Sequence, residues 1–139
     1  MKVFVDTNII IDILERREPF FQDSYRIIQL GLQGKLETLM SAGSVTDVYY
    51  VMSRSLRDAA KTKGKILALT SLIDLCSTTA NGIHTALTLN IADFEDAVIA
   101  AAAKQEKADF IITRNEADFS GSPVPAIDPA QFLRRFFGS

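Results

Sequence analysis

Short apolar segments alternate with longer amphipathic segments along this chain. The segment Lys2–Val5 is short and β-prone, and residues 108–113 have the apolar pattern of a strand buried inside a parallel sheet. Residues 36–42 and 123–127 have the length and composition of two further strands. We therefore expect four strands, one at the start of the chain, one at residues 36–42 and two in the last third of the chain.

Apolar residues at helical spacing fill the stretches between these strands. A helix is expected at 9–14, and another runs to Arg57 with Ser44 as its N-cap. Gly64 interrupts the next polar stretch, and a helix at 66–75 follows. Three more helices are expected at 20–32, 93–107 and 130–137. Residues 77–89 are ambiguous and have room for a short strand and a short helix.

Strands that alternate with helices predict a mainly parallel sheet covered by helices, a three-layer α/β/α sandwich. The 139 residues contain no linker or repeat, so we expect one domain, residues 1–139. Ligands of such sheets bind outside the carboxyl ends of the strands. Asp6 follows the first strand, and Asn115 and Asp118 follow the strand near 110–113. These polar side chains should therefore meet at one edge of the sheet.

The composition is that of a soluble globular protein, with 47% hydrophobic and 23% charged residues. A net charge of −2 argues against nucleic-acid binding through bulk positive charge, so any such binding must be local. The densest basic segment, residues 54–65, has five cations, Arg54, Arg57, Lys61, Lys63 and Lys65, and one acid, Asp58. It can contact phosphates, or it can be a solvated helix end and loop.

Several classes of protein and site are excluded by what the sequence lacks. No apolar run approaches the roughly 18 residues of a membrane-spanning helix, so we expect a cytoplasmic protein without a membrane partner. His84 is the only histidine, which leaves little basis for a histidine metal site or a serine triad. The single cysteine, Cys76, lies in an apolar pattern and is expected in the core.

The acids are the remaining candidates for chemistry. Asp6 either caps the following helix or binds a metal at the end of its strand. Asp96 lies on the small apolar face of its helix, which favours a functional carboxylate, whereas Asp93 is the expected N-cap. Asp47 has a weaker pattern, which a solvated aspartate would share, and Asp12 is interpreted as a polar-face residue or a structural residue of the first helix. Oxygen ligands without histidine or cysteine suit Mg²⁺ or Mn²⁺.

Four segments in order resemble a known family. VFVDTNIIID, SVTDVYYV, DFEDAVIAAAA and FIITRNEADF are similar to the motifs of PIN domains, and more narrowly of VapC-type toxins of toxin-antitoxin pairs. The resemblance implies an Mg²⁺- or Mn²⁺-dependent endoribonuclease that cleaves single-stranded or structured RNA. It also implies an antitoxin that covers the site, and homodimers are common in the family.

The resemblance assigns the acids of the site to Asp6, Asp47 and Asp96. Many members have an aspartate where this chain has Asn115, so the fourth metal ligand is either Asn115 or Asp118. Asp118 has the alternative of capping its turn. Thr7, Asn8 and Thr113 are candidates to orient the ligands or a bound water, or they serve ordinary turns and caps.

RNA needs nearby cations at so acidic a site, and the candidates are Arg54, Arg57 and Arg114. Two other functions stay open. Asn115 and the acidic net charge would also suit a catalytically weak PIN-like module that binds RNA or protein. A structure-specific DNA nuclease would share the same acids and differ in its substrate.

Overall fold

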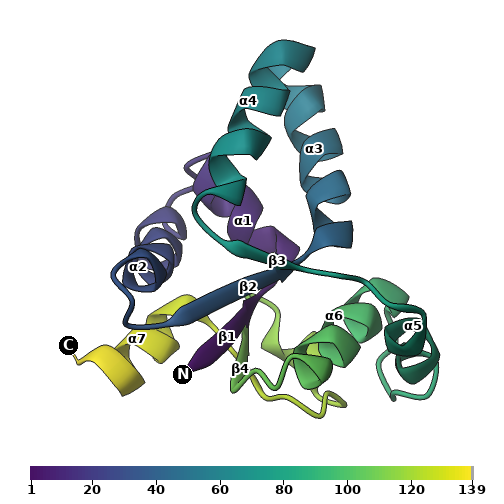
Figure 1. Ribbon diagram of the computed structural model, residues 1–139. Helices are drawn as coiled ribbons and strands as arrows, with labels where there is room; N and C mark the ends of the chain where they lie inside the picture. The colour runs from purple at the N-terminus through teal and green to yellow at the C-terminus, as the bar shows by residue number, and fades with distance from the viewer. Residues whose placement is uncertain (139) are drawn as a thin grey trace.

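A parallel sheet forms the middle of the molecule. The computed structural model describes residues 1–138, and its strands are β1 (Lys2–Val5), β2 (Glu37–Ser41), β3 (Asp74–Cys76), β4 (Phe110–Ile112) and β5 (Ala126–Ile127). They lie in the order β3-β2-β1-β4-β5, and each neighbouring pair is parallel. Figure 1 labels β1 to β4 of this sheet. The chain goes to opposite sides of β1 for β2 and β4. The carboxyl ends of β1 and β4 therefore flank the crevice where ligands of such sheets bind.

Helices connect the strands and cover both faces of the sheet, so the predicted three-layer α/β/α sandwich is confirmed (Figure 1). The helices are α1 (Thr7–Leu14), α2 (Phe21–Leu32), α3 (Ala42–Leu56), α4 (Ala59–Thr70), α5 (Ala80–Ala86), α6 (Phe94–Gln105) and α7 (Pro129–Phe137). A short 3₁₀ helix, η1 (Glu116–Phe119), follows β4. Within residues 1–138, each helix is too short or too polar to cross a membrane.

The strands send alternate side chains into two separate cores. Val3 and Val5 pack with buried residues of α1, α2, α3 and α7. Phe4, between them, packs on the other face against small residues of α6, among them Ala100 and Ala103. The alanines let α6 lie close to the sheet, and Ala97 and Ala101 of the same helix contact α5 through Ala86. The first turn of α6 is thereby held next to the end of β1.

Helices α3 and α4 form a hairpin that projects away from the sheet, here called the α3–α4 arm (residues 42–70; Figure 1). Met52 of α3 and Leu69 of α4 are buried in the larger core. Asp58 begins α4 as its N-cap, accepting from the backbone N–H of Lys61, and the buried Thr62 hydroxyl donates to the Asp58 carbonyl. The base of the arm lies at the carboxyl edge of the sheet, where α3 follows β2 directly.

Some predicted boundaries are wrong. Ser44 does not cap α3: Ser41, the last residue of β2, accepts from the backbone N–H of Gly43 and begins the helix, and Ser44 is buried in its first turn. Gly64 lies inside α4, which ends at Thr70 rather than continuing to residue 75. The predicted strands and the other helices are found close to their expected limits, and residues 77–89 contain α5.

Candidate functional site

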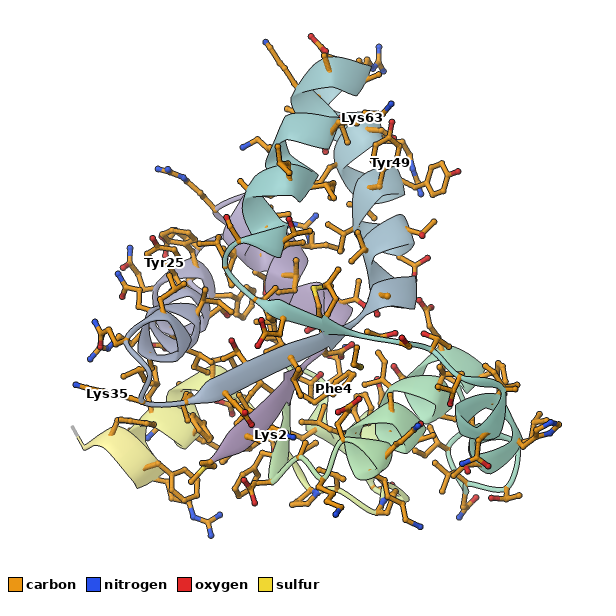
Figure 2. The ribbon with its side chains drawn as sticks, viewed as in Figure 1. Lys2, Phe4, Tyr25, Lys35, Tyr49 and Lys63 are labelled. Atoms are coloured by element: carbon orange, nitrogen blue, oxygen red, sulfur yellow. The ribbon has the colours of Figure 1, made fainter. Side chains whose placement is uncertain are left out.

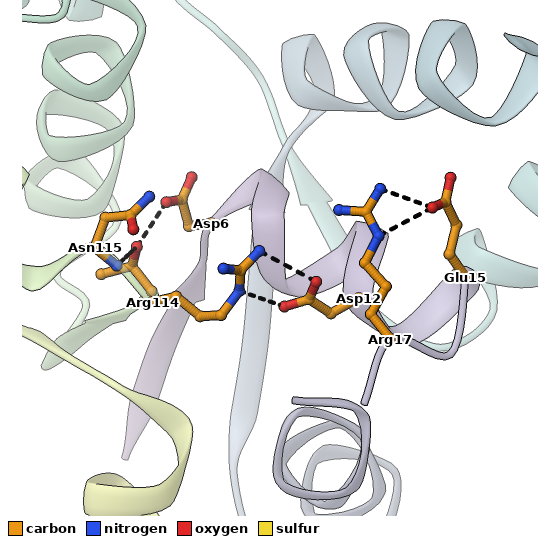
Figure 3. Close-up of polar contacts among 7 residues, drawn as sticks. Asp6, Asp12, Glu15, Arg17, Arg114 and Asn115 are labelled. Atoms are coloured by element: carbon orange, nitrogen blue, oxygen red, sulfur yellow. Dashed lines mark hydrogen bonds and ion pairs between the residues drawn. The ribbon is translucent and has the colours of Figure 1, made fainter. Parts of the chain in front are cut away.

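Asp6 is the most buried acid at the carboxyl edge of the sheet, with 5% of its surface exposed. It caps α1, because one carboxylate oxygen accepts from the backbone N–H of Thr7 at 2.7 Å. The other oxygen accepts from the Thr113 hydroxyl at 2.8 Å, the dashed line at Asp6 in Figure 3. Burial raises the pKa of Asp6, while these two hydrogen bonds oppose the shift. The nearby charge of Asp118 raises the pKa further, and that of Arg114 lowers it. The cap and the site therefore use the same carboxylate.

The turn after β4 lies beside Asp6. The Thr113 hydroxyl donates to Asp6 and accepts from the backbone N–H of Asn115 at 3.1 Å, so it connects the acid to this turn (Figure 3). Thr113 is completely buried, whereas the side chains of Asn115 and Asp118 are exposed. The backbone N–H of Asp118 donates to the Asn115 carbonyl, which closes η1. Both candidates for the fourth ligand thus come from one short turn.

The first turn of α6 brings further acids to this edge. Asp93 accepts from the backbone N–H of Asp96 at 3.0 Å, which confirms Asp93 as the N-cap. The pKa of Asp96 is raised to about 6, chiefly by burial and then by the charges of Asp6, Asp93 and Asp118. Asp6, Asp96 and Asp118 come from three different elements and repel one another. This repulsion between like charges is the electrostatic property that distinguishes the candidate site.

Glu95 is a site residue that the sequence analysis missed. Its pKa is raised to about 7, first by a hydrogen bond shared with Asp47, then by burial and by the charges of Asp47, Asp93 and Asp96. Glu95 therefore connects Asp47 of α3 to the acids of α6. The available signal was the motif DFED, which has more acids in one helix turn than an N-cap requires. The sequence pattern predicts a role only for Asp93 and Asp96 of that motif.

The donor set fits a hard divalent cation. All the candidate donors are oxygens, and the buried atoms Thr7 Oγ1 and Asn8 Oδ1, directly after Asp6, have no hydrogen-bond partner. Within residues 1–138 no three acids, histidines or cysteines converge closely enough to enclose a metal ion. Mg²⁺ commonly keeps several waters and takes only one or two carboxylates directly. Carboxylates that are too far apart to enclose a cation directly can still hold Mg²⁺ partly through its bound waters.

Arg114, a predicted RNA contact, has a partner within the protein. Its guanidinium Nε lies 2.6 Å and its Nη2 3.2 Å from the two carboxylate oxygens of Asp12, which is fully buried (Figure 3). The guanidinium also lies over the ring of Phe20, 4.3 Å from its centre. Of the two interpretations of Asp12, the polar-face position is wrong because Asp12 is completely buried, and its ion pair occupies the Arg114 guanidinium. Arg54 and Arg57 are exposed on the arm, and neither forms an ion pair with the described residues.

The family follows from the sequence comparison. A model of the PIN domain family matches residues 2–117, so this chain belongs to that family, as the motif resemblance had indicated. Ribonuclease VapC1 of Aquifex aeolicus (strain VF5) is 28% identical over 140 residues, covering 97% of this chain and 95% of that protein.

Solved structures agree on the fold. VapBC2 from Rickettsia felis, bound to a promoter DNA fragment, aligns with a TM-score of 0.73 and 18% identity over 92% of this chain and 98% of that chain. A toxin-antitoxin complex from Klebsiella pneumoniae aligns with a TM-score of 0.67 and 20% identity over 91% and 97%.

Proposed function

We propose that this protein is a metal-dependent endoribonuclease and the toxin of a toxin-antitoxin pair in the cytoplasm. One observation carries the proposal: at the carboxyl edge of the sheet the charge of Asp118 in η1 raises the pKa of Asp6 after β1, and the charges of Asp6 and Asp118 raise the pKa of Asp96 in α6. Asp6 and Asp96 would hold Mg²⁺ or Mn²⁺, with Asp47 and either Asp118 or Asn115 completing the set. Similarity to Ribonuclease VapC1 along nearly the whole chain supports RNA as the substrate.

Each side chain has a distinct task in this proposal. A bound divalent cation polarises a phosphodiester and lowers the pKa of a bound water. Thr113 and the backbone of Thr7 hold both oxygens of Asp6 in fixed directions, so Asp6 is oriented before any ligand arrives. Asp96 adds charge from the first turn of α6. Without metal and below about pH 7, Glu95 holds a proton beside Asp47, which limits repulsion between α6 and α3.

An antitoxin partner is part of the proposal. The fold is similar to that of a chain in a toxin-antitoxin complex from Klebsiella pneumoniae, which supports a partner protein that covers the site. We also expect this chain to form homodimers. A neighbouring reading frame for a small DNA-binding protein would agree with this assignment.

RNA cleavage with and without divalent metal tests the proposal. The purified protein should cleave single-stranded RNA in Mg²⁺ or Mn²⁺ and should be inactive in EDTA. Asp6→Asn and Asp96→Asn should each abolish cleavage and leave the fold intact. Asp74→Asn is the matched control, because Asp74 is an exposed acid at the amino end of β3, and it should cleave like the parent. Cleavage in EDTA, or by either site variant, would contradict the metal site.

A second candidate function is favoured by one residue. Asn115 has a neutral amide where many family members have a carboxylate, which would weaken a fourth metal ligand. A PIN-like module that binds RNA or protein without efficient cleavage is therefore the alternative. It would bind an RNA oligonucleotide in Mg²⁺ and leave the strand intact. A DNA nuclease would instead cleave a DNA strand faster than the RNA of the same sequence.

A further inference from the structure

We propose that the exposed stripe of α3 formed by Asp47, Tyr50 and Arg54, with Arg57 at its end, is a track for single-stranded RNA next to the site. Here it is called the α3 track. The inference rests on the proposed ribonuclease function and adds where the substrate strand runs. Tyr50 would stack on a base, and the two arginines would contact phosphates.

The α3 track is continuous along one side of the helix. Residues 47, 50 and 54 are spaced by three and four positions, which places their side chains one above another on one face of α3. Val48 and Met52 mark the opposite, buried side. The core contacts of α3 therefore leave the track uncovered by the rest of the described chain.

The side chains of the α3 track are available to a ligand. Tyr50 is 58% exposed. Its ring makes an edge-to-face contact with the ring of Tyr49, with 5.6 Å between the ring centres and 86° between the ring planes. Arg54 and Arg57 are exposed and form no ion pair with residues 1–138. Lys63 lies on α4 near the free end of the same arm, which adds positive charge there (Figure 2).

The α3 track begins at the acids of the site. Asp47 shares a hydrogen bond with Glu95, and Glu95 is close enough to Asp96 for their charges to interact. From Asp47 the helix rises about 1.5 Å per residue, so Arg54 lies roughly 10 Å and Arg57 roughly 15 Å further along. At about 3.4 Å per stacked nucleotide, that length corresponds to about three or four nucleotides.

The chemistry of the α3 track favours a nucleic-acid strand over a protein segment. An exposed aromatic ring between cations is the combination that binds single strands, by base stacking and phosphate contact. Next to the track, the exposed Thr46 and the half-buried Ser53 are polar. An amphipathic protein helix would need a broader apolar surface than one tyrosine provides. Single-stranded RNA is therefore the ligand we assign.

Binding is measured separately from cleavage by using the Asp6→Asn protein as the parent. The probe is a fluorescein-labelled single-stranded RNA of ten nucleotides in Mg²⁺, and anisotropy gives its Kd over a series of salt concentrations. Tyr50→Leu should weaken binding about 5- to 150-fold without changing the salt slope, and Tyr50→Trp should restore it. Arg54→Gln and Arg57→Gln should each weaken binding and reduce the salt slope by about 0.7.

Two controls remove similar groups elsewhere. Leu67→Ala removes an exposed apolar side chain from α4, and Arg134→Gln removes an exposed cation from α7; neither should change the Kd. If the track variants bind like the parent while the wild-type protein cleaves RNA, the track is wrong and the proposed function stands. If the wild-type protein neither binds nor cleaves RNA, both are wrong. Dissociation of a homodimer by Tyr50→Leu with unchanged RNA affinity would assign the surface to a second copy and overturn the track.

Discussion

Asp12 is a fully buried carboxylate whose charge is matched by Arg114, a residue far away in the sequence. Two hydrogen bonds join the pair, and the arginine also lies over Phe20. Arg114→Ala would leave Asp12 charged and buried without its partner. We expect a loss of about 3–5 kcal/mol in the free energy of unfolding, measured by urea denaturation.

The exposed pair of Glu15 and Arg17 is the matched control. Its guanidinium–carboxylate distance is 2.7 Å, close to that of the buried pair, but 47% of the Arg17 side chain is exposed. Arg17→Ala should therefore cost less than about 1 kcal/mol. Equal losses for Arg17→Ala and Arg114→Ala would show that burial does not determine how much an ion pair contributes to the free energy of unfolding.

Asp118 and Asn115 compete for the place of the fourth ligand. The Asp118 charge already raises the pKa of both Asp6 and Asp96, and a charged carboxylate is the better ligand for a hard cation. We expect Asp118→Ala to lose more Mn²⁺ affinity and RNA-cleavage activity than Asn115→Ala, and Asn115→Asp to be tolerated or activating. An inactive Asn115→Ala beside a fully active Asp118→Ala would reverse the assignment.

At the scale of elements, the first turn of α6 makes stability depend on pH. The pKa values of Glu95 and Asp96 are raised to about 7 and about 6, so the folded protein binds more protons than the unfolded chain between about pH 4 and pH 7. Stability due to these groups is therefore lost as the pH rises through that range. In EDTA, Glu95→Gln should raise the Tm relative to wild type more at pH 7.5 than at pH 4.5. A Tm difference independent of pH would contradict the raised pKa.

The segment from Gly64 to Cys76 shows where elements could not be predicted from the sequence. Leu69, Ile73 and Cys76 fit helical spacing, and they are buried as expected, yet the chain turns into β3 after residue 73. Three residues are too few to show the alternation of a strand. Pairing with β2 decides the structure here, and that pairing joins residues about 35 positions apart, such as Ser41 and Cys76. Periodicity thus identified the buried residues and missed their secondary structure.

At the scale of the whole molecule, the edge of the sheet where the acids gather could be predicted from the order of strands and helices. Asp6 and Asp96 lie there because parallel strands end at one edge and α6 begins beside it. The pairing of Asp12 with Arg114 and of Asp47 with Glu95 could not be predicted. Each joins elements that only the folded chain brings together, and helical periodicity carries no information about such distant partners.

The central claim is that these acids form a divalent-cation site. In the metal-free protein the mutual repulsion of Asp6, Asp96 and Asp118 opposes folding, and a cation bound only to the folded state would relieve it. Binding at 100 times the Kd should add about 2.7 kcal/mol to the free energy of unfolding.

The most direct measurement is the Tm of the wild-type protein during a titration with Mn²⁺ at pH 7.5, compared with Asp96→Asn. We expect a saturable rise in the Tm of the wild type at millimolar Mn²⁺ or below. Asp96→Asn should start at a higher Tm in EDTA and gain much less from the metal. A wild-type Tm that does not change with millimolar Mn²⁺, or an equal rise in both proteins, would contradict the metal site.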